Sequence, residues 1–245
     1  MKKINVIGII VACFLFLILL FIFYMGYTHK IDRASEKLNL RQASENATGI
    51  ERDHVWVNLG LSVCWATCNV GADYAKEYGN LYAWGETEVK RFYNWDTYKL
   101  KNEKGFTKYC TKPDCGVADD KTVLDNSDDV AHNSWGGRWR LPTKNEWVEL
   151  IDNCSFTWTT EQGVGGCRLC SRINGNSIFL PAAGGMDEDG RKELNTVGIY
   201  WSSSLYLDKN KPVDASFVYF NEDEIKIGHN NRTYGYSVRP VIESR

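Results

Sequence analysis

The sequence lacks an excess of charge of either sign, because its 29 lysines and arginines are balanced by 31 aspartates and glutamates. Proteins that bind nucleic acid through its phosphates usually carry a clear basic excess, so this composition gives no support to a nucleic-acid partner. The apolar content is enough for the core of one domain in a chain of 245 residues.

Histidine is scarce as well, with four residues, at positions 29, 54, 132 and 229. A serine hydrolase needs a nucleophile on a sharp, glycine-flanked turn, with a histidine base beside it. The serines at 202–204 lie in a predicted strand without such a turn. We therefore predict ordinary strand serines there and no hydrolase triad.

Charged residues are missing between Lys3 and Lys30, and residues 4–27 are apolar apart from Asn5. At a rise of about 1.5 Å per residue, a helix over this stretch is roughly 36 Å long, enough to cross a hydrocarbon core of about 30 Å. We interpret residues 1–27 as an uncleaved membrane anchor whose residues 4–27 contact lipid.

Two other interpretations of the N-terminus stay open. A cleaved signal peptide has a shorter apolar region and a small-x-small site, and residues 25–30 do not resemble one. Ile10-Val-Ala-Cys13 resembles a lipobox, in which Cys13 is acylated. The mature chain would then begin with the apolar residues 14–23 instead of the usual polar tether, so we favour the anchor.

Residues 28–52 are mostly helix formers with few apolar side chains, which predicts a polar, partly helical spacer before a globular domain at 53–245. Lysine or arginine flanks the apolar stretch on both sides, so the charge bias on its orientation is weak. Because the domain carries seven cysteines, we place it outside the cytoplasm, in the periplasm or at the cell surface.

The most informative stretch of the domain is 135–147. Within it, residues 138–141 alternate charged and apolar side chains, and Pro142 ends any ladder. This pattern predicts a short strand with Trp139 and Leu141 turned inward.

A helix is predicted to follow this strand at Lys144. Thr143 stands three residues before Glu146, which is the spacing of a capping box, where each side chain bonds the other residue's amide. One apolar stripe then continues at Trp147, Leu150, Ile151 and Cys154.

Short alternating runs predict β structure elsewhere, beginning with residues 55–59 and 61–66. Asn174-Gly175 supplies the positive φ angles of a tight turn, so 167–173 and 177–181 are predicted to form a hairpin. A polar loop is expected around 184–190. Four more strands are predicted at 199–206, 215–221, 224–228 and 236–242.

Several stretches, in this order, resemble a family of bacterial surface domains, the Fibrobacter succinogenes major paralogous domain. They are Val57-Asn-Leu-Gly-Leu-Ser-Val, Trp65-Ala-Thr-Cys-Asn-Val-Gly-Ala72, Tyr82-Ala-Trp-Gly-Glu86, Asp128-Asp-Val-Ala-His132, Trp139-Arg-Leu-Pro-Thr-x-x-Glu-Trp147, Gly175-Asn-Ser-Ile-Phe-Leu-Pro-Ala-Ala-Gly184, Tyr200-Trp-Ser-Ser-Ser204 and Ser237-Val-Arg-Pro-Val241. Members of this family are distantly similar to formylglycine-generating enzymes and to C-type lectin folds.

The resemblance implies an α+β, C-type-lectin-like domain of short antiparallel strands with one main helix, whose last strand returns beside the first. It also implies that the turn-rich residues 70–134 form long loops held by buried aromatic rings, with about one ring in four exposed. The residues expected to have structural roles are Trp139, Arg140, Thr143, Glu146, Trp147, Asn174, Gly175 and Arg239.

The seven cysteines outside the anchor do not have a convincing metal or redox spacing. On strands, Cys167 and Cys170 point to opposite faces, and Cys64 and Cys68 stand roughly 13 Å apart, too far for one zinc ion. Thioredoxin-like chemistry needs a thiol at a helix N-terminus, which Cys167 lacks. We expect buried thiols and disulfides, of which 110–115 is the easiest closure, with at least one thiol unpaired.

Enzymatic activity is not predicted. Formylglycine-generating enzymes carry their working cysteines in the C-terminal part of the domain, and this chain has no cysteine after Cys170. The acids Asp125, Asp128 and Asp129 do not follow a calcium-loop spacing, and are interpreted as loop acids. No cofactor or metal is expected.

These patterns favour a membrane-anchored, extracytoplasmic recognition module that binds a glycan or a protein at a bacterial cell envelope. Residues 230–234 offer amides and a ring that suit a sugar, although a loop between strands uses the same residue types. The alternatives are an enzyme that modifies envelope polymers and a structural paralogue without a ligand.

Overall fold

The computed structural model describes residue 24 and residues 48–208 and 213–244. Except for Tyr24, the predicted anchor lies outside these residues, and so does most of the predicted spacer. No helix among the described residues is long and apolar enough to cross a membrane. Residues 47–245 form one compact unit, distinct from residues 1–46.

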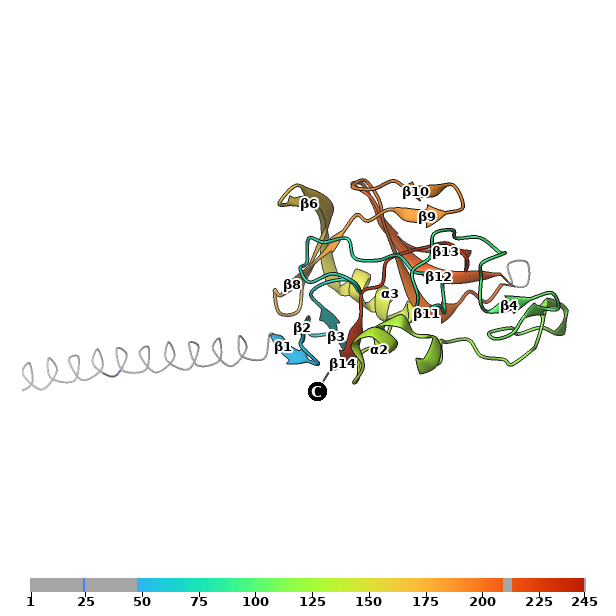
Figure 1. Cartoon of the computed structure of the whole chain (residues 1–245). Helices are drawn as coiled ribbons and strands as arrows, with labels where there is room; N and C mark the ends of the chain where they lie inside the picture. The colour runs from blue at the N-terminus through green and yellow to red at the C-terminus, as the bar shows by residue number, and fades with distance from the viewer. Residues whose placement is uncertain (1–23, 25–47, 209–212, 245) are drawn as a thin grey trace, which may run out of the picture. The chain divides into compact units, whose positions relative to one another are not determined.

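This unit is built mostly of antiparallel sheet with few helices, as an α+β-like, sheet-rich fold (Figure 1). A four-stranded sheet has the order β1-β2-β3-β14, formed by β1 (Thr48–Glu51), β2 (His54–Val57), β3 (Val63–Ala66) and β14 (Val241–Glu243). Figure 1 shows β14 beside β3, so the expected return of the last strand to the first ones is confirmed.

The sheet begins before the predicted domain boundary at residue 53. Thr48–Glu51 pairs along its whole length with His54–Val57. The end of the predicted spacer is therefore a strand and not a helix. Arg52 and Asp53 both have positive φ angles, which makes the turn between the two strands tight.

Two three-stranded sheets form the rest of the framework. One contains β6 (Cys154–Glu161), β7 (Val164–Ser171) and β8 (Ser177–Pro181), and the other contains β11 (Gly198–Leu205), β12 (Asp214–Phe220) and β13 (Ile225–Asn231). The predicted strands at 199–206, 215–221 and 224–228 match β11, β12 and β13. The predicted strand at 236–242 is shorter, because only Val241–Glu243 forms a ladder, whereas Tyr236 and Ser237 make single bridges.

The hairpin predicted around Asn174-Gly175 is confirmed, but its turn is longer than predicted. Cys170 pairs with Ser177, and of the two turn residues only Gly175 has a positive φ, of 77°. Asn174 instead donates from Nδ2 to the carbonyl of Asn58, at 2.9 Å. The Asn174 side chain thereby binds the hairpin to the loop that contains Asn58.

The predicted helix is α3 (Lys144–Asn153), and its capping box is confirmed. Thr143 Oγ1 accepts from the Glu146 amide at 3.2 Å, and Glu146 Oε2 accepts from the Thr143 amide at 2.7 Å. The Arg140 guanidinium forms a two-bond pair with the Glu146 carboxylate, at 2.8 and 2.6 Å, and also binds Glu243 of β14. The start of the helix is thereby fixed to the end of the chain.

The strand predicted at 138–141 is wrong. Trp139 and Leu141 are buried as expected, but only Arg140 makes a bridge, with Val241. The Leu141 amide is bound by the Asp129 carboxylate at 2.7 Å, and Pro142 has no amide hydrogen. The segment therefore has too few donors left for a ladder.

The core surrounds the indole of Trp147. This ring packs against Trp65, with centroids 4.5 Å apart, and against Tyr200, at 6.0 Å. A buried tryptophan removes about 150–250 Å² from water, which stabilises the fold by about 4–6 kcal/mol. Near this core, the buried Arg239 guanidinium donates to Asn69, to the carbonyl of Ala66 and to that of Phe179.

Residues 70–134 form the expected long loops over buried rings. Of the ten rings in this region, Tyr74 and Phe92 are exposed. The short elements here are β4 (Lys101–Asn102), β5 (Gly105–Phe106), the 3-10 turns η1 (Pro113–Cys115) and η2 (Asn126–Asp128), and α2 (Val130–Trp135). The predicted polar loop at 184–190 is also more regular than expected, since β9 (Gly185–Asp187) and β10 (Gly190–Lys192) pair there.

All seven described cysteines are unpaired, and no two of them are at disulfide distance in the described part of the chain. Cys110 Sγ donates to the carbonyl of Lys112 at 2.8 Å instead of bonding Cys115. The expected disulfides are therefore not present in this structure.

Candidate functional site

A groove of about 350 Å³ lies where three loops meet, and we call it the loop groove. Its walls are residues 93–96, residues 187–189 where β9 turns into β10, and residues 231–234 at the end of β13. The lining side chains are Tyr93, Asn94, Trp95, Asp96, Asp187, Glu188, Asp189, Asn231, Thr233 and Tyr234.

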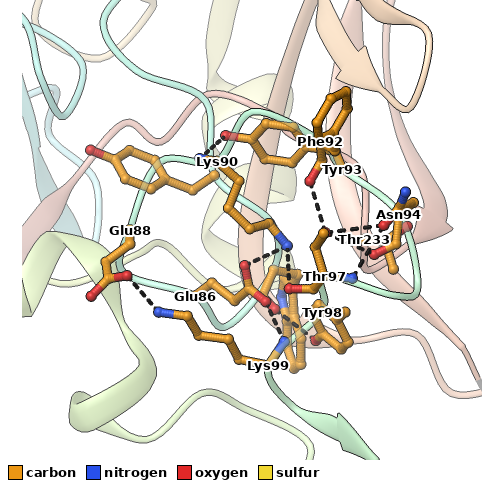
Figure 2. A network of polar contacts seen from close by, with 12 residues as sticks. Glu86, Glu88, Lys90, Phe92, Tyr93, Asn94, Thr97, Tyr98, Lys99 and Thr233 are labelled. Carbon is orange, nitrogen blue, oxygen red and sulfur yellow. Dashed lines mark hydrogen bonds and ion pairs between the residues drawn. The ribbon is translucent and has the colours of Figure 1, made fainter.

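The first wall is held by a buried ion pair (Figure 2). The Lys90 ammonium lies 2.7 Å from the Glu86 carboxylate, and both side chains are almost fully buried. Glu86 also accepts the amide of Lys99 at 2.6 Å, while Lys90 donates to the carbonyl of Thr97 at 3.2 Å. These bonds close residues 86–99 into a rigid loop, so its tip has a fixed shape.

Tyr93 and Thr97 fix the tip itself. The Tyr93 hydroxyl donates to the carbonyl of Leu81 at 2.5 Å, and Thr97 Oγ1 donates to the carbonyl of Phe92 at 2.8 Å. The Tyr93 ring lies so close to Gly235 that a Cβ atom there would be 2.7 Å from it. Glycine at 235 is thus required for the first and third walls to meet.

The second wall is an acidic hairpin turn. Lys192 lies 2.6 Å from Asp187 and 3.2 Å from Asp189. Partial burial alone would raise the pKa of Asp187, but Lys192 and the amide of Asp189 outweigh it and lower that pKa. Asp187 is therefore an ionised acceptor and does not suit the role of a general acid.

The third wall overlaps the stretch 230–234, whose amides and ring suit a sugar but are also typical of a loop between strands. Asn231, Thr233 and Tyr234 line the loop groove. Asn230 donates from Nδ2 to the Tyr236 hydroxyl at 2.8 Å, and the buried Arg232 guanidinium lies 4.1 Å from the centre of the Phe106 ring. Asn231 and Tyr234 are half-buried and open to a ligand, whereas Thr233 is 2% exposed and donates from Oγ1 to Asn231 Oδ1 at 3.1 Å. Thr233, Asn230 and Arg232 therefore hold the wall in place.

The chemistry of the loop groove is that of an acceptor-rich surface beside rings. Asp96, Glu188 and Asp189 are exposed at its rim, and Trp95 and Tyr234 are half-buried. Carboxylates only accept hydrogen bonds, so they suit ligands that present hydroxyl or ammonium donors. No group of three or more metal-binding side chains occurs among the residues with described positions.

The other residues weighed from sequence have local roles. Asp125 and Asp128 bind Lys108, and Asp129 caps α2, so the three carboxylates do not converge on one point. In β11, Ser202 donates to the carbonyl of Ser216, and Ser204 accepts the Lys144 amide. These serines bond to backbone, as strand serines do.

No ligand-binding residue was predicted from the sequence, because 93–96 and 187–189 are far apart in sequence and neither contains a known motif. Their common signal is an acid beside a turn, which is also typical of ordinary surface loops. Comparisons of the chain with protein-family models, with curated proteins and with solved structures find no match. The candidate site therefore depends on the geometry described above.

Proposed function

We propose that this protein is a non-catalytic recognition module whose loop groove binds a glycan at a bacterial cell envelope. The observation that carries the proposal is the pairing of half-buried rings, Trp95 and Tyr234, with carboxylate acceptors in one groove. Sugar hydroxyls are donors for carboxylates and amides, and ring faces pack against the apolar C–H faces of sugars.

The setting at an envelope rests on the sequence. Residues 4–27 have the length and apolar character of a membrane anchor, and we propose that the domain lies outside the cytoplasm, attached through residues 28–47. The motifs quoted above support a C-type-lectin-like fold, and we propose that its long loops contact the ligand. This part of the proposal is an analogy of fold, whereas the groove is an argument from its own residues.

The proposal is tested with a glycan array probed with the full chain in non-ionic detergent. Asp96→Asn and Asp189→Asn remove charge from the rim without changing side-chain size, and both residues are exposed, so folding is expected to be unaffected. We expect either change to weaken the strongest glycan signal roughly tenfold, the effect of losing one charged hydrogen bond.

A matched control is Asp114→Asn, at an exposed acid outside the loop groove, which we expect to leave the signal unchanged. Absence of any glycan signal, or equal loss in the control, would contradict glycan recognition by this groove. Turnover of an arrayed polymer that depends on one side chain would instead indicate the enzyme alternative.

A further inference from the structure

A second cavity, of about 330 Å³, lies at the start of α3 and shares no residue with the loop groove. We call it the helix-start cavity. It is lined by Thr122, Val123, Thr143, Lys144, Asn145, Ser204, Leu205, Tyr206, Leu207 and Ser216. The proposed glycan function does not use any of these residues.

The helix contributes positive charge to this cavity. The first amides of a helix have no partner within it, and the aligned peptide dipoles add a partial positive charge at that end. In α3 the Lys144 amide is bound by Ser204 Oγ at 3.0 Å, whereas the Asn145 amide has no acceptor within the described chain. The exposed Lys144 ammonium makes no ion pair with any described residue.

An independent observation is the buried hydroxyl of Ser216. This residue is 1% exposed, and its Oγ has no hydrogen-bond partner in the part of the chain that is described. Val218 and Phe220, which share its face of β12, belong to the same core cluster as Trp147 of α3. The Ser216 side chain therefore points to the helix side of the sheet, and the residue is one of those that line the cavity.

A buried hydroxyl without a partner destabilises a fold, because it has lost its hydrogen bonds to water. Such a group is therefore expected where a ligand supplies the missing bond. The hydroxyl can donate to an anion that the Asn145 amide and the Lys144 ammonium also bind.

The outer part of the cavity is apolar. Val123 and Leu207 are exposed, and the Tyr206 ring stacks on the imidazole of His229, with centroids 3.7 Å apart. The acid on this face of β12, Asp214, binds His229 Nδ1 at 2.7 Å. Asp214 is not among the residues that line the cavity, so its carboxylate does not face an incoming anion there.

We propose that the helix-start cavity binds an anionic group, carboxylate or phosphate, carried on a small apolar body. The Asn145 amide and Lys144 bind the charge, and Ser216 donates one further hydrogen bond from below. Val123, Tyr206 and Leu207 contact the apolar part. The N-terminus of a helix, together with a lysine and a hydroxyl donor, binds carboxylates and phosphates through the same kind of hydrogen bonds. The proposal therefore covers both anions.

The experiment is calorimetric titration of the full chain in non-ionic detergent with butyrate, and separately with inorganic phosphate, at constant ionic strength. Saturable binding of butyrate assigns the site to carboxylates, and saturable binding of phosphate assigns it to phosphate groups. Failure of both probes to saturate would overturn the proposal. Because the loop groove is separate, Asp96→Asn is expected to leave either titration unchanged.

Two variants locate the binding. Ser216→Ala removes a hydroxyl without a partner, so we expect unchanged or higher thermal stability but roughly tenfold weaker anion binding. Lys144→Gln, at an exposed position, is expected to weaken binding severalfold and to reduce its dependence on salt. Ser155→Ala and Lys226→Gln are the matched controls. Full affinity in both Ser216→Ala and Lys144→Gln would contradict the assignment.

Discussion

The carboxylate of Asp129 accepts a hydrogen bond from the amide of Leu141 at 2.7 Å, although Asp129 precedes α2 in the sequence and Leu141 follows it. The same side chain accepts the amides of Ala131 and His132 and so caps that helix. One buried acid therefore holds α2 against the segment that leads into α3. It also explains why residues 138–141 do not form a strand.

Replacing Asp129 with alanine is expected to destabilise the domain strongly. The change removes a helix cap and leaves the buried Leu141 amide without an acceptor, which together cost about 2–4 kcal/mol. Urea unfolding of the full chain, followed by tryptophan fluorescence, measures the loss. Asp114→Ala, at an exposed acid, is the control and should change the free energy of unfolding little. Equal losses in both variants would contradict the role of Asp129.

Loss of the capping box of α3 is expected to lower the free energy of unfolding less than loss of Asp129. Thr143→Ala removes the acceptor of the Glu146 amide and is expected to cost about 1 kcal/mol, whereas Thr143→Ser keeps the hydroxyl and most of the stability. Thermal unfolding of both variants checks this difference. Thr160→Ala, at an exposed position of β6, is the control for loss of a threonine. A serine variant as unstable as the alanine variant would count against capping.

Stability is expected to fall in mild acid because of His54. Its imidazole stacks on Trp135 at 3.7 Å, and burial lowers its pKa below 6.5 although Asp53 and Asp73 oppose the shift. The folded state therefore binds this proton less readily than the unfolded state. The free energy of unfolding should decrease as the pH falls below about 6.5, until the folded-state pKa is passed.

His54→Gln removes this titration and should flatten that part of the pH profile. The measurement is urea unfolding of both proteins between pH 5 and pH 8, where an imidazole titrates. His132→Gln, a change at the histidine of α2, serves as the comparison. Parallel profiles for the parent and His54→Gln would show that His54 is not the group responsible.

The cysteines should react in an order set by burial. Burial raises the pKa of Cys154 to about 11 and raises that of Cys167 as well, so both hold their protons at neutral pH. Alkylation requires the thiolate, and we expect Cys154 and Cys167 to be labelled only after unfolding, whereas the half-buried Cys170 reacts in the native state. Peptide mass spectrometry reads out each site.

The same labelling tests the absence of disulfides in the structure. In unfolded protein that has not been reduced, all seven cysteines of the domain should accept label. Protection of Cys110 and Cys115 together would show that this pair is oxidised in the protein as isolated, as the short sequence separation first favoured. Early labelling of Cys167 would contradict its burial.

The sequence predicts local features of this fold well. Thr143 and Glu146 interact within one helical turn, and Gly175 needs its positive φ whatever surrounds it, so both features follow from nearby residues. The strand at 138–141 was wrong because a distant acid, Asp129, takes a donor that the pattern assigned to a ladder. The periodicity of a short stretch does not show that a residue elsewhere in the chain competes for one of its backbone amides.

The candidate site was harder to predict than the framework. Residues 230–234 were considered for sugar binding because of their amides and ring, although a loop between strands uses the same residue types. Their neighbours in the groove, Tyr93 and Asp187, come from distant loops. Contact between these loops depends on Gly235, whose missing side chain admits the Tyr93 ring, and on the bonds between Met186 and Gly235. No single stretch of sequence contains that relationship.

Hydrogen–deuterium exchange of the full chain, with and without its strongest array glycan, tests the central claim most directly. Recognition by the loop groove predicts slower exchange at residues 93–96, 187–189 and 231–234, and no change at the start of α3. Protection confined to other surfaces, or no protection with a glycan bound, would contradict the account.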